Sequence, residues 1–169
     1  MKKKPFIIGI VGLKNTGKTT LIINIIKILV KKKYNVSTIK HAHHEVQIDE
    51  PGRDSYQHRI AGAHQVILST ENKWALINSC KETPELEYLI KKFENTDIIL
   101  VEGYKNSKIP KIEVRRYKKY DYKNEDIAEN IIAISSDTKV SQNKIIFNSN
   151  DYDAVSNFII KKHNEINCE

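Results

Sequence analysis

Short runs of apolar residues recur along the chain and alternate with amphipathic segments. Continuous apolar runs bounded by turn residues are typical of strands that are buried on both faces. Strands are predicted at residues 6–11, 35–40, 97–103, 131–135 and 144–147. Apolar residues at helical spacing predict helices at 20–30, at 83–93 and from 151 onward. Strands that alternate with helices indicate an α/β fold in three layers around a mostly parallel sheet.

Two regions depart from this simple alternation. Residues 111–115 alternate polar and apolar side chains, which predicts a strand with one face in solvent. Residues 65–70 and 74–77 are two further apolar runs, separated by a short polar turn at 71–73. That arrangement predicts a β-hairpin insertion, preceded by a short helix at 54–61.

The most specific motif lies directly after the first predicted strand. Residues Gly12–Thr19 match the phosphate-loop pattern G-x-x-x-x-G-K-[ST], and a predicted helix follows. The glycines allow successive backbone N–H groups to point at phosphate oxygens, and the start of the helix adds its positive dipole end. Lys18 is expected to reach the β- and γ-phosphates, and the Thr19 hydroxyl to bind Mg²⁺. The predicted nucleotide-binding residues are Gly12, Lys14, Asn15, Thr16, Gly17, Lys18, Thr19 and Thr20.

A nucleotide site of this kind needs a carboxylate on a neighbouring strand. Glu102 ends the most apolar strand in the second half of the chain, at the edge where ligands gather in open α/β sheets. We expect Glu102 to coordinate the metal or its waters, or to orient an attacking water. Asp97, at the opposite end of that strand, is interpreted as a strand-entry turn residue.

The polar segment from His41 to Asp54 follows the second strand. Its three histidines suggest a metal site, but they lack the helical spacing of metal ligands and no cysteine is nearby. The favoured interpretation is a set of switch-like groups near Mg²⁺ and the γ-phosphate. Asp49 and Asp54 are the best placed acids, and Arg53 or Arg59 would neutralise charge on phosphate. Plain solvation of these arginines is an equal alternative.

Recognition of guanine requires a carboxylate opposite its N1–H and N2–H₂ donors. The full N-K-x-D pattern is absent, and Asp137, just after the strand at 131–135, is the substitute predicted from the sequence. An aspartate at this place is also a common turn residue.

Composition narrows the class of protein. The 169 residues suffice for one domain, and we expect a single phosphate-loop nucleotide-binding domain over 1–169. Cys80 and Cys168 are far apart, which favours neither a zinc site nor a disulfide and suggests a reducing cytoplasm. The lysines after Met1 mimic a signal peptide, but Gly9 and Gly12 interrupt the apolar run that follows. We therefore expect a cytoplasmic protein without a membrane partner.

The net charge is +7, with lysines spread along the chain. The stretch at 118–123 contains lysines and tyrosines but also an acid, and is interpreted as a solvated loop. No nucleic-acid partner is expected. The positive charge suits an anionic ligand and an acidic protein partner equally well.

Several stretches together resemble the MobB family of molybdopterin-guanine dinucleotide biosynthesis proteins. They occur in the family's order across roughly the first two thirds of the chain. The combination K-H-A-H-H, D-x-P-G-x-D-S and L-V-E-G-[FY]-K is specific, whereas the phosphate loop alone is generic. The stretches are Gly12 to Thr20, Ile39 to His44, Asp49 to Tyr56, Ala61 to Ala63, Leu100 to Lys105 and Ile109 to Val114.

The resemblance implies a GTP-binding accessory protein with weak GTPase activity, acting when molybdopterin receives a guanine nucleotide. It implies GTP and Mg²⁺ as cofactors, and a homodimer that assists a MobA-like guanylyltransferase; molybdopterin is a further candidate ligand. By position, Gly17, Lys18 and Thr19 bind phosphate and magnesium, and Glu102 belongs to the second nucleotide motif. The alternatives are a small-molecule kinase, opposed by the scattered arginines, and a metallochaperone-type GTPase, opposed by the lack of cysteine ligands.

Overall fold

The computed structural model describes residues 4–42, 46–120, 122, 128–138 and 143–168. The chain forms two compact units. Residues Met1–His41 and Leu86–Glu169 form one, called here the parallel-sheet unit, and Ala42–Glu85 form the other, the hairpin unit. The single nucleotide-binding domain expected from the sequence stays a prediction.

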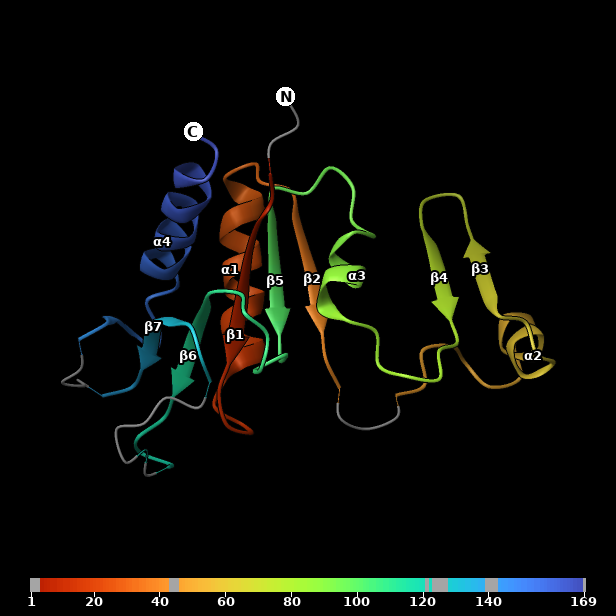
Figure 1. Cartoon of the computed structure of the whole chain (residues 1–169), viewed down its shortest axis with the longest axis horizontal. Helices are drawn as coiled ribbons and strands as arrows, with labels where there is room; N and C mark the ends of the chain where they lie inside the picture. The colour runs from red at the N-terminus through yellow and green to blue at the C-terminus, as the bar shows by residue number, and fades with distance from the viewer. Residues whose placement is uncertain (1–3, 43–45, 121, 123–127, 139–142, 169) are drawn as a thin grey trace. The chain divides into compact units, whose positions relative to one another are not determined.

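A six-stranded sheet is the centre of the parallel-sheet unit, in the order β2-β5-β1-β6-β7-β8, and each neighbouring pair is parallel (Figure 1). This confirms the expected α/β fold with a mostly parallel sheet. Parallel strands buried on both faces are apolar throughout, and β5 shows this most clearly. The strands are β1 (Phe6–Val11), β2 (Val36–Lys40), β5 (Ile98–Glu102), β6 (Lys111–Arg115), β7 (Ile131–Ser136) and β8 (Ile145–Asn148).

Helices cover both faces of this sheet, so that the unit has three layers. Helices α1 (Lys18–Lys31) and α4 (Tyr152–Glu165) run side by side in Figure 1. Both pack on one face of the sheet, against residues such as Ile98 and Leu100. Helix α3 (Leu86–Ile90) packs against the alternate residues of β5 on the opposite face. Because successive side chains of a strand point to opposite faces, β5 contributes to a separate hydrophobic core on each face of the sheet.

The hairpin unit contains α2 (Asp54–Ile60) and the antiparallel pair β3 (Gln65–Ser69) and β4 (Trp74–Asn78). The backbone N–H of Thr70 donates to the Lys73 carbonyl at 2.9 Å and closes the turn between the two strands. The predicted hairpin insertion is confirmed.

The prediction that β6 has one face in solvent is wrong. Its polar residues Lys111, Glu113 and Arg115 are all fully buried. Strand β6 lies between β1 and β7, and each charge on it has partners inside the protein. The Lys111 ammonium donates to three backbone carbonyls, those of Ser107, Ile109 and Glu129. Alternating polarity therefore marks a charged but buried face here.

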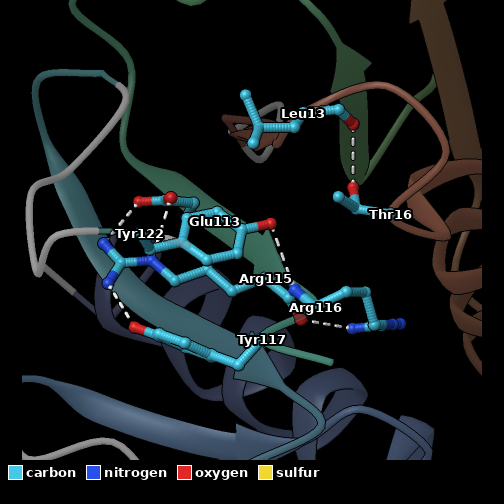
Figure 2. Close-up of polar contacts among 7 residues, drawn as sticks. All are labelled: Leu13, Thr16, Glu113, Arg115, Arg116, Tyr117 and Tyr122. Atoms are coloured by element: carbon cyan, nitrogen blue, oxygen red, sulfur yellow. Dashed lines mark hydrogen bonds and ion pairs between the residues drawn. The ribbon is translucent and has the colours of Figure 1, made fainter. Parts of the chain in front are cut away.

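Glu113 and Arg115 form a bidentate ion pair, with both nitrogen–oxygen distances 2.9 Å (Figure 2). Arg115 also donates to the Tyr117 hydroxyl at 3.0 Å, and its guanidinium lies 5.6 Å from the ring centre of Tyr122. Burial lowers the pKa of Arg115, but its hydrogen bonds to Glu113 and Tyr117 outweigh this and raise the pKa above its usual range. Both charges are therefore retained inside the protein.

Replacing Glu113 by leucine should destabilise the fold strongly, because it leaves the Arg115 charge buried without its carboxylate. The free energy of unfolding, measured with urea, should fall by about 3–5 kcal/mol. The double variant Glu113→Leu/Arg115→Met should recover most of that loss. Glu165→Gln, which breaks the exposed pair with Lys162, is the matched control and should change little. Equal stability of Glu113→Leu and the parent protein would refute this account.

Candidate functional site

The phosphate loop connects β1 to α1, and its backbone includes residues in the left-handed region. Asn15 and Gly17 have φ values of 58° and 90°, in the left-handed region. Gly17 is the residue that caps α1, which begins at Lys18. Turns that mix left- and right-handed residues direct successive N–H groups into one concavity, and a helix start adds positive potential there.

Close packing explains why Gly12 is a glycine. A Cβ added at Gly12 would lie 2.6 Å from the Val114 carbonyl oxygen and 2.8 Å from Thr16 Oγ1. The buried Thr16 hydroxyl in turn donates to the Leu13 carbonyl at 3.0 Å. Thr16 thus contributes its side chain to the shape of the loop. Of the other predicted residues, Lys14 and Asn15 are exposed on the loop, and Thr20 is exposed in the first turn of α1.

The Lys18 side chain folds back over the loop. Its ammonium donates to the carbonyls of Gly12 at 3.0 Å and Leu13 at 2.7 Å. Burial lowers the pKa of Lys18; the charge of Glu102 opposes this, and the charge of Lys40 adds to it. The ammonium thus lies at the loop, bound to two neutral carbonyls. A negatively charged phosphate oxygen would form a stronger hydrogen bond with it than these carbonyls do.

Glu102 lies next to Thr19 at the loop, and the metal-binding roles expected for both residues stay predictions. Both oxygens of the Glu102 carboxylate lie 3.4 Å from Thr19 Oγ1. Lys40 Nζ lies 4.0 Å from the same carboxylate. A hydroxyl and a carboxylate at this separation are hard oxygen ligands that fit a Mg²⁺ ion and its waters. Asp97, at the other end of β5, accepts a hydrogen bond from the Asn35 backbone N–H at 2.8 Å, which agrees with its predicted turn role.

The ends of β2 and β5 lie side by side at this edge of the sheet, because Lys40 is in register with Glu102. The His41 N–H donates to the Glu102 carbonyl at 2.9 Å, and the His41 ring lies 4.6 Å from that of Tyr104. Gly103 has a φ of 96°, and a Cβ there would lie 2.9 Å from the Cβ of His41. His41 is thus packed against the residues that follow Glu102. His43 and His44 lie outside the described residues, and the described ones contain no cluster of three potential metal ligands.

Two residues that no sequence motif marks contact the loop from the β6 side. Arg116 Nη2 lies 3.0 Å from the position that a Cβ of Gly17 would occupy. Tyr120, in the stretch interpreted as a solvated loop, donates its hydroxyl to the Lys14 carbonyl at 2.6 Å. Arg116 directly follows β6, which could have marked it as a residue at the ligand-binding edge of the sheet. Only the strand order, however, shows that β6 is next to β1.

Comparison with known proteins gives the family. The sequence model of the family described as molybdopterin guanine dinucleotide synthesis protein B, MobB, matches residues 7–137. The molybdopterin-guanine dinucleotide biosynthesis adapter protein of Haemophilus influenzae is 34% identical over 90% of this chain and 86% of its own length. The chain belongs to the MobB family.

Other MobB proteins agree with this assignment. The Escherichia coli adapter protein of the same description is 33% identical over 86% of each chain. The crystal structure of Bacillus subtilis MobB superposes with a TM-score of 0.74 at 27% identity, covering 92% of this chain and 96% of that one. These likenesses confirm the three-layer phosphate-loop fold. No helix within the described ranges is long and apolar enough to cross a membrane.

Asp137, the predicted guanine partner, follows β7 at the same edge of the sheet. Its carboxylate accepts a hydrogen bond of 2.8 Å from the Tyr117 backbone N–H, which follows β6. This hydrogen bond connects the segment that follows β6 to the segment that follows β7, beside the phosphate loop. The role of Asp137 in base recognition stays a prediction.

Asp49 and Arg53 lie in the hairpin unit, and both have partners there. Arg59 binds the Asp49 carboxylate through Nη2 at 2.9 Å and Nε at 3.3 Å. Arg53 pairs with Glu50 at 2.9 Å in an exposed contact. The ion pair between Asp49 and Arg59 connects the segment before α2 to α2 itself within the hairpin unit. The catalytic roles expected for Asp49 and Arg53 beside the γ-phosphate stay predictions.

Lys18→Ala should weaken nucleotide binding by more than ~2 kcal/mol, because it removes a charge-assisted hydrogen bond to phosphate. Calorimetric titration of the variant with GTP and Mg²⁺ measures the loss. Lys27→Ala changes an exposed lysine of the same helix and should bind as the parent does. Unchanged affinity in Lys18→Ala would mean that the loop is not the nucleotide site.

Proposed function

We propose that this protein is a GTP-binding adaptor in molybdopterin-guanine dinucleotide biosynthesis, with slow GTPase activity. The observation that carries the proposal is the pairing of Thr19 with Glu102 beside Lys18, on a complete phosphate loop. It supports the binding of a Mg²⁺–nucleoside triphosphate. The related proteins of H. influenzae and E. coli are described as adapter proteins of this pathway.

Slow hydrolysis is supported by the residues at the metal side of the loop. Residues that complete a fast hydrolytic site, such as a water-orienting Gln or a charge-stabilising Arg, are worth about 10³–10⁵ in rate. The residues that end or follow β2 and β5 there include Lys40, His41, Glu102 and Tyr104. None of these four is Gln or Arg. Bound GTP would therefore persist long enough to be presented to another protein.

A small-molecule kinase is disfavoured by how the arginines are used. A kinase needs several arginines to clamp donor and acceptor phosphates. The chain has four, and three of them are engaged by carboxylates: Arg53, Arg59 and Arg115. A metallochaperone GTPase is less well supported too, because His41 is packed against Tyr104 and Gly103.

The partners follow from the adaptor role. We propose that the protein assists a MobA-like guanylyltransferase in the cytoplasm and supplies GTP to it. The net charge of +7 favours an acidic surface on that enzyme. Direct binding of molybdopterin, itself an anion, is a further hypothesis on the same ground.

We also propose a homodimer, for which the hairpin unit offers the surface. Trp74 is 69% exposed, and Ile67, Leu68 and Leu76 are exposed on the same two strands. A two-stranded sheet is marginally stable in water, and apolar side chains gathered on one mark an interaction surface. A second copy of the chain is the occupant we propose, since two-fold dimers are the commonest oligomers.

The adaptor proposal predicts specific binding of GTP and transfer to a guanylyltransferase. Titration with GTP, ATP and GDP, with and without Mg²⁺, should show a preference for guanine nucleotides and a dependence of GTP affinity on Mg²⁺. The GTP-loaded protein should then stimulate a guanylyltransferase acting on molybdopterin, and Lys18→Ala should not. Preference for ATP, or phosphoryl transfer to a small acceptor, would contradict the proposal.

Trp74→Ser combined with Ile67→Ser should shift the dimer toward monomer, because both changes remove exposed apolar surface from the hairpin. Sedimentation velocity at micromolar concentration measures the change. Val30→Ser removes an exposed apolar side chain from α1 and is the matched control, for which the dimer should persist. A parent protein that sediments as a monomer would exclude the homodimer.

A further inference from the structure

Arg116 is the arginine whose guanidinium lies against the phosphate loop. Its Nη2 is 3.0 Å from the position of a Gly17 Cβ, which places the guanidinium in close contact with the loop backbone. Its Nη1 donates to the Arg115 carbonyl at 2.8 Å. Among the residues that the structure describes, no carboxylate forms an ion pair with Arg116. A half-buried positive charge beside an anion-binding loop is left for a ligand to neutralise.

The strand order shows which end of a nucleotide Arg116 would meet. β1 carries the loop and pairs with β5 on one side and with β6 on the other. Thr19 and Glu102 lie on the β5 side and would hold the Mg²⁺ that accompanies the β- and γ-phosphates. Arg116 follows β6 and therefore lies on the opposite side of the loop. The nucleotide must continue there with its α-phosphate and its nucleoside.

We propose that Arg116 binds the α-phosphate of the nucleotide. A planar guanidinium offers parallel N–H donors that match two phosphate oxygens, and losing such a pair weakens binding. The proposal rests on the nucleotide-binding function proposed above and assigns the direction in which the nucleotide lies. The γ-phosphate lies toward β5 and the base toward β6 and β7, where Asp137 accepts its bond from Tyr117.

Neighbouring contacts hold Arg116 in this position. Its backbone N–H donates to the Tyr122 hydroxyl at 3.1 Å, and Arg115 on the adjacent position is locked to Glu113. Because side chains alternate along a strand, Arg115 points into the buried cluster and Arg116 points away from it, as Figure 2 shows. The ion pair thus fixes the backbone from which the second arginine extends.

Arg116→Gln tests the assignment, because glutamine keeps much of the length and removes the charge. Affinities for GTP, GDP and GMP should all fall by the same factor, about 10- to 100-fold. The single-turnover rate of GTP hydrolysis in the fully loaded variant should equal that of the parent. Phosphorus NMR of bound GDP should show a shifted α-phosphate resonance and an unmoved β-phosphate resonance. Lys119→Gln, an exposed cation of the same segment, is the matched control and should leave affinity and spectrum unchanged.

Several outcomes would overturn the assignment. If GTP binding alone weakens, or hydrolysis slows, Arg116 acts on the γ-phosphate and the proposed direction is wrong. If all affinities equal those of the parent, Arg116 is not a ligand contact, while the GTP adaptor itself stands. If the parent protein prefers ATP, the GTP adaptor proposal is wrong. The α-phosphate contact would still be supported in that case if Arg116→Gln lowered the affinities for ATP, ADP and AMP by the same factor. Arg116→Lys, which keeps the charge, checks that folding is intact and should bind with intermediate affinity.

Discussion

The parallel pairing of β1 with its two neighbours is the constraint on which the site depends. Ile10 is in register with Glu102 on one side, and Val11 with Glu113 on the other. All these strands end at one edge, so residues separated by about ninety positions in the chain meet around one loop. Because side chains alternate with a period of two, a slip of one residue in β5 would turn Glu102 away from Thr19. The register therefore determines the chemistry.

The buried charges of β6 are the second unusual feature beside the loop. An ion pair removed from water commonly adds no more stability than apolar residues of the same size, so its presence requires another explanation than stability alone. Glu113 and Arg115 form directional contacts with each other, and Tyr117 and Tyr122 lie beside the arginine. Directional contacts of this kind define the backbone at the strand end more narrowly than apolar packing does. That strand end is where Arg116 begins.

Local patterns predicted the strands, the hairpin, the phosphate loop and Glu102, because each of these is encoded by neighbouring residues. The β6 error had a physical cause: alternation reveals two different faces but does not say whether the polar one meets water or buried partners. Arg116 was missed because its role depends on β6 lying next to β1, a pairing of distant segments that no local pattern contains. The roles expected for Asp49 and Arg53 stay predictions; the pairing of Asp49 with Arg59, ten residues along the chain, is not contained in any local pattern.

The distribution of positive charge around the loop fits the proposed combination of strong nucleotide binding and slow turnover. Catalysis requires interactions that are stronger in the transition state than in the ground state, and these belong at the γ-phosphate. An arginine on the α-phosphate side meets the same charge before and after hydrolysis, so it increases affinity without increasing the rate. Lys18 would contribute to both affinity and rate, whereas Arg116 lies across β1 from Glu102. A site arranged in this way would retain its nucleotide, as the proposed transfer of GTP to an enzyme requires.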